Sequence, residues 1–174
     1  MTPAEYIQLK AFARVDGAMV ALLWTVCFAC YLIGLRNSLF GMVAIVLMVV
    51  TPFYVARRLR RFRDEDLHGV ISFLRGWAFV ILVFFYGAIL LAVVLYVYFA
   101  YMDQGYVLLS LQQTLSSPET QAMLSQSGMS TSVEESLQMF SEMRPSDYAL
   151  NVLTLNIALG IILGLPIAVL FKKV

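Results

Sequence analysis

Five arginines occupy seven consecutive positions of this chain, from residue 57 to residue 63, and a sixth follows at residue 75. Guanidinium groups bind phosphate and carboxylate oxygens, so the set is a candidate site for a lipid headgroup or a partner protein. Its members are Arg57, Arg58, Arg60, Arg61, Arg63 and Arg75. Alternatively, these arginines only lie at a solvated helix end and fix the orientation of the chain in the membrane, and that alternative stays open. No aromatic stacking platform is interleaved with them in a soluble fold, which argues against nucleic-acid binding.

Three acidic residues follow these arginines directly, at positions 64 to 66. Arg60 and Asp64, like Arg61 and Glu65, stand four positions apart. Side chains at this spacing are neighbours on one face of a helix. We therefore expect two ion pairs if the flanking helices extend beyond the membrane.

Residue types used in catalysis are sparse in the rest of the chain. His68 is the only histidine, and a solvated loop position explains it better than a general base. Cys27 and Cys30 lie within an apolar run, where thiols are inert. No metal-ligand spacing, nucleophile elbow or phosphate-binding glycine loop occurs. We predict that the protein is not an enzyme and has no catalytic residue, cofactor or metal site.

The elements that position the arginines are predicted to be membrane helices. The chain has 174 residues, of which 61% are hydrophobic and 13% charged, whereas soluble domains are about half apolar and a quarter charged. A span needs about 20 mainly apolar residues, and backbone groups in lipid must be paired internally. The predicted fold is all-α, with four transmembrane helices. The predicted spans are residues 17–35, 38–56, 75–101 and 148–171.

The basic residues predict the topology of these four spans. Ten of the twelve Lys and Arg residues fall on one side of a four-span arrangement, and only Arg36 and Arg144 fall on the other. Basic residues concentrate in cytoplasmic segments. We therefore expect both termini to be cytoplasmic. The cytoplasmic parts are an amphipathic helix at 1–16, the arginine-rich loop at 57–74 and a tail at 172–174, whereas residues 102–147 form a cap on the other side.

Polar and small residues in the last span are candidates for packing or transport. Asn151, Thr154 and Asn156 are expected to hydrogen-bond between helices more often than to contact a substrate. Gly160 and Gly164 form a G-x-x-x-G motif on the face of Asn156, where small residues let helices approach closely. The motif does not say whether the neighbouring helix belongs to the same chain or to another copy, so a homo-oligomer stays open.

The N-terminal segment and the outer cap both contain residues that typically begin or end helices. Thr2 and Glu5 form a capping box, with Pro3 at the first helical position. In the outer cap, Ser117 begins a helix that ends at Gly128, residues 131–134 read as a second capping box, and Ser146 caps the last span. We expect two or three short amphipathic helices in this cap.

The outer cap is acidic, with one arginine, and it contains several methionines. Methionine side chains adapt to varied surfaces and suit a docking face. The alternative is that the cap helices simply lie over the bundle. The acids are Asp103, Glu119, Glu134, Glu135, Glu142 and Asp147, and the methionines are Met123, Met129, Met139 and Met143.

The stretch RRFRDEDLHGVISFLRGWAFV at 60–80 resembles the signature of the domain-of-unknown-function family 4199. The segment YVYFAYMD at 96–103 and the closing TLNIALGIILGLPIAVLFKK are similar to the same family. The resemblance implies a small four-helix protein of the bacterial inner membrane and carries no catalytic activity. It also implies a genomic neighbourhood that often includes a membrane glycosyltransferase acting on polyprenyl-phosphate, which is an association and not a mechanism.

The function expected from these observations is non-enzymatic. The leading hypothesis is an accessory or scaffold subunit of another membrane protein, in polyprenyl-linked envelope glycoconjugate assembly. The expected partners are anionic membrane lipids and a membrane glycosyltransferase or another membrane protein. The alternative is a small transporter or lipid flippase with a groove near Pro52, Asn151 and Asn156.

Overall fold

The computed structural model describes residues 2–173, so the outermost residues of the predicted segments 1–16 and 172–174 lie outside the described chain. Its elements are helices, and four of them are long and apolar enough to cross a membrane. These are α1 (Pro3–Gly34), α2 (Ser38–Arg61, continued by the π-helical turn η1, Phe62–Asp66), α3 (Phe73–Tyr101) and α7 (Pro145–Phe171). The predicted all-α membrane fold with four long helices is confirmed.

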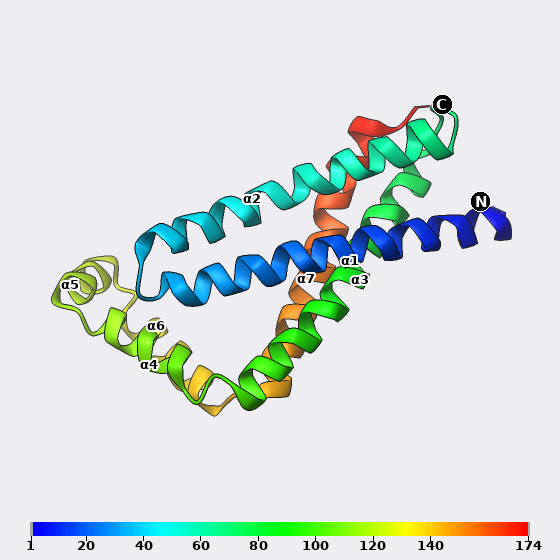
Figure 1. Cartoon of the computed structure of the whole chain (residues 1–174). Coiled ribbons are helices and arrows are strands. Elements are labelled where there is room, and N and C mark those ends of the chain that lie inside the picture. The colour runs from blue at the N-terminus through cyan, green and yellow to red at the C-terminus, as the bar shows by residue number, and fades with distance from the viewer. Residues whose placement is uncertain (1, 174) are drawn as a thin grey trace.

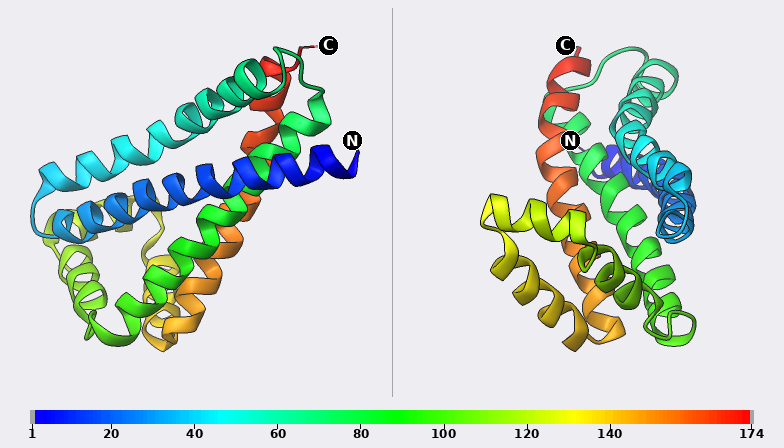
Figure 2. Two further views of the ribbon diagram at one scale, coloured as in Figure 1. Left: turned by 45° about the vertical axis from the view of Figure 1, so that its right-hand side comes forward. Right: turned by 90° about the vertical axis from the view of Figure 1, so that its left-hand side faces the viewer.

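Helices α1 and α2 form an antiparallel hairpin, and α3 and α7 form a second antiparallel pair (Figure 1). The two pairs lie close together at the end that holds both termini and diverge toward the other end (Figure 2). Three short helices, α4 (Tyr106–Leu115), α5 (Pro118–Ser127) and α6 (Ser130–Glu142), lie at this wide end. The ten basic residues assigned to one side therefore gather at the termini end, whereas assignment of that end to the cytoplasm stays a prediction from charge.

Helix α3 is the centre of the bundle because small residues let its neighbours approach closely. A Cβ at Gly17 of α1 would lie 2.7 Å from the Tyr86 Cβ, and a Cβ at Gly87 would lie 3.2 Å from the Gly17 carbonyl oxygen. Phe79, Val80, Val83 and Phe84 of α3 are almost fully buried. Helix α2 packs mainly on α1 and buries few residues, so most of its apolar surface is left for lipid.

Most helix limits follow the signals in the sequence. The Thr2 capping box and Pro3 begin α1, which continues without a break through the predicted N-terminal helix and first span. Asn37 caps α2 after a tight turn. Ser117 begins α5, and Gly128 ends it in the left-handed conformation, with φ at 68°.

Two predicted caps are wrong. Helix α6 begins at Ser130, one residue before Thr131, so Thr131 is inside the helix and caps nothing. Helix α7 begins at Pro145 instead of after Ser146, because Asp147 folds back and accepts a bond from the Arg144 backbone N–H at 3.0 Å. Proline is favoured at the first helical position, since it has no N–H to leave unpaired.

Candidate functional site

The arginine-rich segment, predicted as a loop, is helical through Asp66. This geometry divides its guanidinium groups between the inside and the outside of the bundle. Arg58 points inward and contacts Asp16 of α1, with its Nε 2.6 Å and its Nη2 2.5 Å from the Asp16 Oδ1. Asp16 is only 2% exposed. A buried carboxylate is costly unless it is paired, so this ion pair ties α2 to α1.

Arg63 and Arg75 also connect helices at the termini end. The Arg63 Nη1 donates to the carbonyl oxygen of Phe171, at the end of α7, over 3.1 Å. Arg75, at the start of α3, lies 3.2 Å from Glu5 and 3.1 Å from the Gln8 side-chain oxygen. These contacts neutralise charge and satisfy a helix-end carbonyl, so these two arginines have a structural role.

Arg57, Arg60 and Arg61 form the exposed part of the predicted set. Arg60 lies 3.6 Å from Asp64 and Arg61 lies 2.7 Å from Glu65, which are the two pairs expected from the spacing of four. Exposed pairs of this kind contribute about 0.3–0.5 kcal/mol. Among residues 2–173, Arg57 has no ion pair or hydrogen-bond partner. Of the six predicted arginines, only these three offer guanidinium groups to a headgroup or a partner.

Phe62 is the anchor of this segment and was not identified from the sequence. It is 2% exposed, its ring stacks on Phe79 at 4.9 Å, and Phe12 lies 5.0 Å away. A single aromatic residue between charged neighbours is the signal that was available. Burial of a phenylalanine side chain contributes about 1.5–3 kcal/mol, so Phe62 fixes which arginines face the bundle.

Asp16 is a second residue that sequence reasoning undervalued. It is the last residue of the predicted N-terminal helix at 1–16 and directly precedes the first predicted span. The signal was an acid one residue before Gly17, the position of close approach to α3. A carboxylate beside so tight a contact is shielded from water and must find a cation.

The carboxylates near this end respond to their partners. The pKa of Glu5 is lowered, first by the hydrogen bond from the Thr2 backbone and then by Arg75. The pKa of Asp64 is lowered by the hydrogen bond from Arg63 and by the charge of Arg60. Both carboxylates are thus held ionised. Within residues 2–173, no three His, Cys, Asp or Glu side chains are placed to share a metal ion.

The G-x-x-x-G motif packs against a helix of the same chain. A Cβ at Gly160 would lie 2.5 Å from the Phe84 Cβ, and a Cβ at Gly164 would lie 2.9 Å from the Trp77 Cδ1. Trp77 also donates from its Nε1 to the Ile161 carbonyl oxygen, over 3.1 Å. The motif therefore explains the α3–α7 pair without a second copy.

The expected hydrogen bonds between helices are not formed by the polar residues of α7. Asn156 donates to the Val152 carbonyl oxygen at 2.8 Å, and Thr154 donates to that of Leu150 at 2.9 Å. Asn151 lies near the start of α7, where its amide contacts the Met143 sulfur at 3.9 Å. Asparagine and threonine can bond to carbonyls of the preceding turn, and here that local option replaces a partner helix.

The outer cap is held by few contacts, and α5 and α6 bury no residue. Tyr148 of α7 donates its hydroxyl to the Phe140 carbonyl oxygen at 2.6 Å, and the two rings lie 4.9 Å apart. The cap helices lie beside the α3–α7 pair at the wide end (Figure 2), and α4 contacts the tip of the α1–α2 hairpin through Tyr106. Whether the cap is a docking face or only a cover of the bundle stays a question for experiment. Glu119, Glu134 and Glu135 are exposed.

The methionines of the cap are mostly on its surface. Met123 is 72% exposed, Met139 is 63% exposed and Met129 is 54% exposed, whereas Met143 is half-buried near Asn151. These side chains and the glutamates together make a surface of mixed apolar and acidic character. This surface and the exposed arginines at the opposite end are the two candidate contact regions of the chain.

Comparison with known proteins identifies one family. Residues 16–173 match the model of a family described as a protein of unknown function, DUF4199. This match covers most of the chain and confirms the resemblance carried by residues 60–80. No curated protein and no solved structure matches the chain.

Proposed function

This chain belongs to the family of unknown function DUF4199, and we propose that it is a non-catalytic accessory or scaffold subunit of another membrane protein. The observation that carries the proposal is the outer cap, because α5 and α6 bury no residue of their own. A folded segment that contributes so little to the core is explained by a partner. Its exposed glutamates and methionines suit a partner with a basic and partly apolar surface.

The interior of the bundle supports this role over transport. The buried polar side chains within residues 2–173 are Asp16, Thr51 and Asp103. Each is paired within the chain: Asp16 with Arg58, Thr51 with the Trp24 Nε1 at 3.2 Å, and Asp103 with backbone N–H groups. A polar substrate needs exchangeable polar partners along its path, and these groups are already occupied.

The three residues expected to line a transport groove are not brought together. Asn151 and Asn156 lie on α7, whereas Pro52 lies on α2, and these two helices approach each other only near the termini end (Figures 1 and 2). The Asn156 amide donates a hydrogen bond to the Val152 carbonyl oxygen of its own helix. We therefore favour the accessory role over a transporter or flippase.

Within this role, we place the protein in polyprenyl-linked envelope glycoconjugate assembly, on the strength of the family resemblance. The partner would be a membrane glycosyltransferase of the inner membrane. The exposed guanidinium groups of Arg57, Arg60 and Arg61 would stay available to the phosphates of anionic lipids beside such a partner.

Site-specific photocrosslinking in the native membrane tests the proposal. A photoreactive residue at Met123 or Met139 of the cap should form a crosslink to one membrane protein, identified by mass spectrometry. The matched control is Leu155 of α7, which is 62% exposed and belongs to the predicted span 148–171. We expect this position to react with lipid alone.

Charge variants connect the crosslink to the cap surface. The triple change of Glu119, Glu134 and Glu135 to Gln should reduce the crosslink yield by about tenfold, whereas Arg57→Gln should leave it unchanged. The role is wrong if neither cap position yields a protein crosslink. Crosslinks to a second copy of this chain would replace the accessory role with self-assembly.

A further inference from the structure

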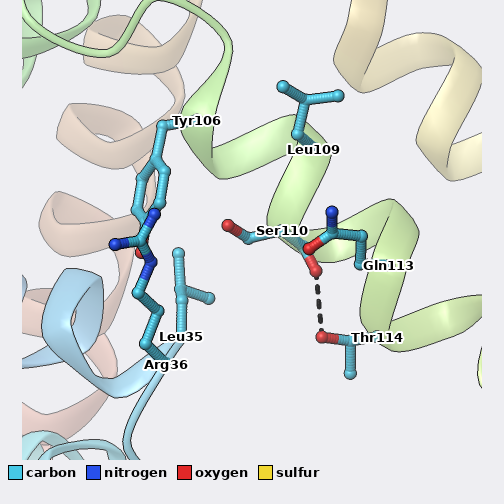
Figure 3. Close-up of a pocket in the computed structure, with 7 residues that line it drawn as sticks. All are labelled: Leu35, Arg36, Tyr106, Leu109, Ser110, Gln113 and Thr114. Atoms are coloured by element: carbon cyan, nitrogen blue, oxygen red, sulfur yellow. Dashed lines mark hydrogen bonds between the residues drawn. The ribbon is translucent and has the colours of Figure 1, made fainter.

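A cavity of about 360 Å³ lies at the wide end of the molecule, between the tip of the α1–α2 hairpin and helix α4. Leu35 and Arg36 line it from the hairpin, and Tyr106, Leu109, Ser110, Gln113 and Thr114 line it from α4 (Figure 3). The lining thus combines one cation, three hydroxyl groups, one amide and two leucines. None of the lining residues is acidic.

The two walls of the cavity are fixed in position by contacts that leave the Arg36, Ser110 and Gln113 side chains free of hydrogen bonds within residues 2–173. Asp103, only 8% exposed, accepts bonds from the backbone N–H groups of Gly105 and Val107 and so caps the first turn of α4. The Tyr106 hydroxyl reaches the Leu32 carbonyl oxygen of α1 at 3.5 Å. Gly105 has a φ of 84°, which favours glycine and turns the chain into α4. The cavity is therefore formed before any ligand binds.

Arg36 is the charged group of this cavity. Its guanidinium lies over the Tyr106 ring, 5.1 Å from the ring centre (Figure 3). Within residues 2–173 it has no carboxylate partner. The other arginine at this end, Arg144, is already paired with Asp147 at 3.1 Å. A cation oriented by an aromatic ring and left without a counter-charge favours an anionic ligand.

The position of the cavity indicates where that anion comes from. The hairpin tip ends α1 and α2, which are long and apolar enough to cross a membrane, so a bilayer spanned by these helices would place Arg36 near the lipid headgroups. Leu35 and Leu109, of which Leu109 is 57% exposed, provide apolar surface in its lining. A soluble anion gains nothing from such surface, whereas the glycerol backbone and acyl chains of a lipid do.

We propose that this cavity binds the phosphate group of an anionic glycerophospholipid whose headgroup carries hydroxyl groups, as in phosphatidylglycerol. Arg36 contacts the phosphate, and Ser110 and Gln113 can hydrogen-bond to headgroup hydroxyls. The Thr114 hydroxyl donates to the Ser110 carbonyl oxygen at 2.9 Å, so it can only accept a bond from the headgroup. A headgroup with an ammonium or choline group is disfavoured, because the lining offers no carboxylate for its positive charge. This inference is independent of the accessory role.

Lipid titration followed by native mass spectrometry tests the site on the full chain in a neutral detergent. Arg57, Arg60 and Arg61 are changed to Gln in every sample, so that the opposite end does not retain anionic lipid. Phosphatidylglycerol should bind at least tenfold more tightly than phosphatidylcholine. Both lipids offer a phosphate to Arg36, but only the glycerol headgroup has hydroxyl groups for Ser110 and Gln113, and choline brings a positive charge to a lining that contains an arginine and no acid.

Two variants and one control assign the binding to the cavity. Arg36→Gln should weaken phosphatidylglycerol binding about tenfold, and Leu109→Trp should do the same by filling the cavity without removing the charge. The matched control, Arg144→Gln, removes an arginine at the same end and should change binding by less than about twofold. Circular dichroism checks that each variant is folded, and the two cavity variants are independent of each other.

Three results would overturn the proposal. Equal binding by the Arg36→Gln and Arg144→Gln proteins would mean that Arg36 is not the phosphate contact. Equal binding of the two lipids would remove the selectivity. Displacement of phosphatidylglycerol by millimolar inorganic phosphate would mean that the site takes a soluble anion instead of a lipid.

Discussion

The two ends of this molecule are built in opposite ways. At the termini end, Arg58, Arg63 and Arg75 each connect two helices that are distant in sequence. The C-terminal tail adds a backbone pair there, because Ile71 and Lys173 exchange hydrogen bonds of 2.8 and 3.0 Å. At the wide end, the charged contact of Arg144 is with Asp147, three residues away. Stability is therefore concentrated at one end, and accessible surface at the other.

This difference explains why similar residues have different roles at the two ends. Arginine is a structural connector where it meets a buried carboxylate, and a potential ligand contact where it meets none. Arg58 and Arg36 are examples of the two cases, since Arg58 faces the buried Asp16 and Arg36 faces a cavity without acids. The following predictions test how far this division holds.

The largest effect is expected at the buried ion pair. Arg58→Ala leaves the Asp16 carboxylate buried without a counter-charge, so we expect the free energy of unfolding to fall by about 3 kcal/mol or more. Arg61→Ala, one turn further along the helix, removes an exposed pair and should cost less than about 0.5 kcal/mol. Unfolding in mixed micelles of increasing SDS fraction, followed by circular dichroism, compares the two. Equal losses would show that the termini end is not organised around Asp16.

Close helix contact gives the second effect. Gly160→Ala places a Cβ 2.5 Å from the Phe84 Cβ, and overpacking of this kind costs about 1–3 kcal/mol. The matched change is Gly76→Ala on α3, where the nearest atoms would be at an ordinary 3.7 Å. There, the higher helix propensity of alanine should leave stability unchanged or raise it by up to about 1 kcal/mol. A destabilising Gly76→Ala and a harmless Gly160→Ala would reverse the assignment of the tight contact.

The sequence was sufficient for the elements of the fold but not for their contacts. Apolar length predicts the four long helices, and Ser117 and Gly128 predict α5, because these signals are local. Whether an arginine side chain is buried between helices or exposed depends on which face of α2 packs against α1. Phe62 and Asp16 together determine that face. Phe62 stands between charged neighbours and Asp16 precedes Gly17, but neither local pattern says which helix the side chain will meet.

The candidate site shows the same limit. Spacing alone predicted the Arg60–Asp64 and Arg61–Glu65 pairs, since both partners lie on one helix. The cavity at Arg36 joins a hairpin turn to a helix some 70 residues later, so no window of sequence contains it. Asn156 was predicted to bond between helices, but a carbonyl of its own preceding turn was closer.

A smaller effect is expected where the cap joins the bundle. Tyr148→Phe removes the hydroxyl that bonds to the Phe140 carbonyl oxygen but keeps the aromatic contact. We expect the C-terminal turn of α6 to open more easily by about 1 kcal/mol, with global unfolding unchanged. Hydrogen exchange of the α6 amides measures this. Tyr101→Phe, at a side chain that is 73% exposed, should alter nothing, and a comparable change there would remove the special role of Tyr148.

The smallest effect is acid sensitivity at the first turn of α7. The pKa of Asp147 is lowered in the folded state, first by the Arg144 side chain and then by the Arg144 backbone N–H. A carboxylate with a lowered folded pKa stabilises the fold above its unfolded pKa of about 3.9, and that contribution is lost as pH falls through the folded value. Hydrogen-exchange protection at residues 145–149, corrected for intrinsic rates, should therefore decrease below about pH 4. Asp147→Asn should give low protection at every pH.

Glu5 has a lowered pKa for a similar reason, but Arg75 also ties it to α3, so the first turn of α1 should keep more protection at the same pH. Equal acid fraying at both helix starts would mean that the termini end is no better anchored than the wide end.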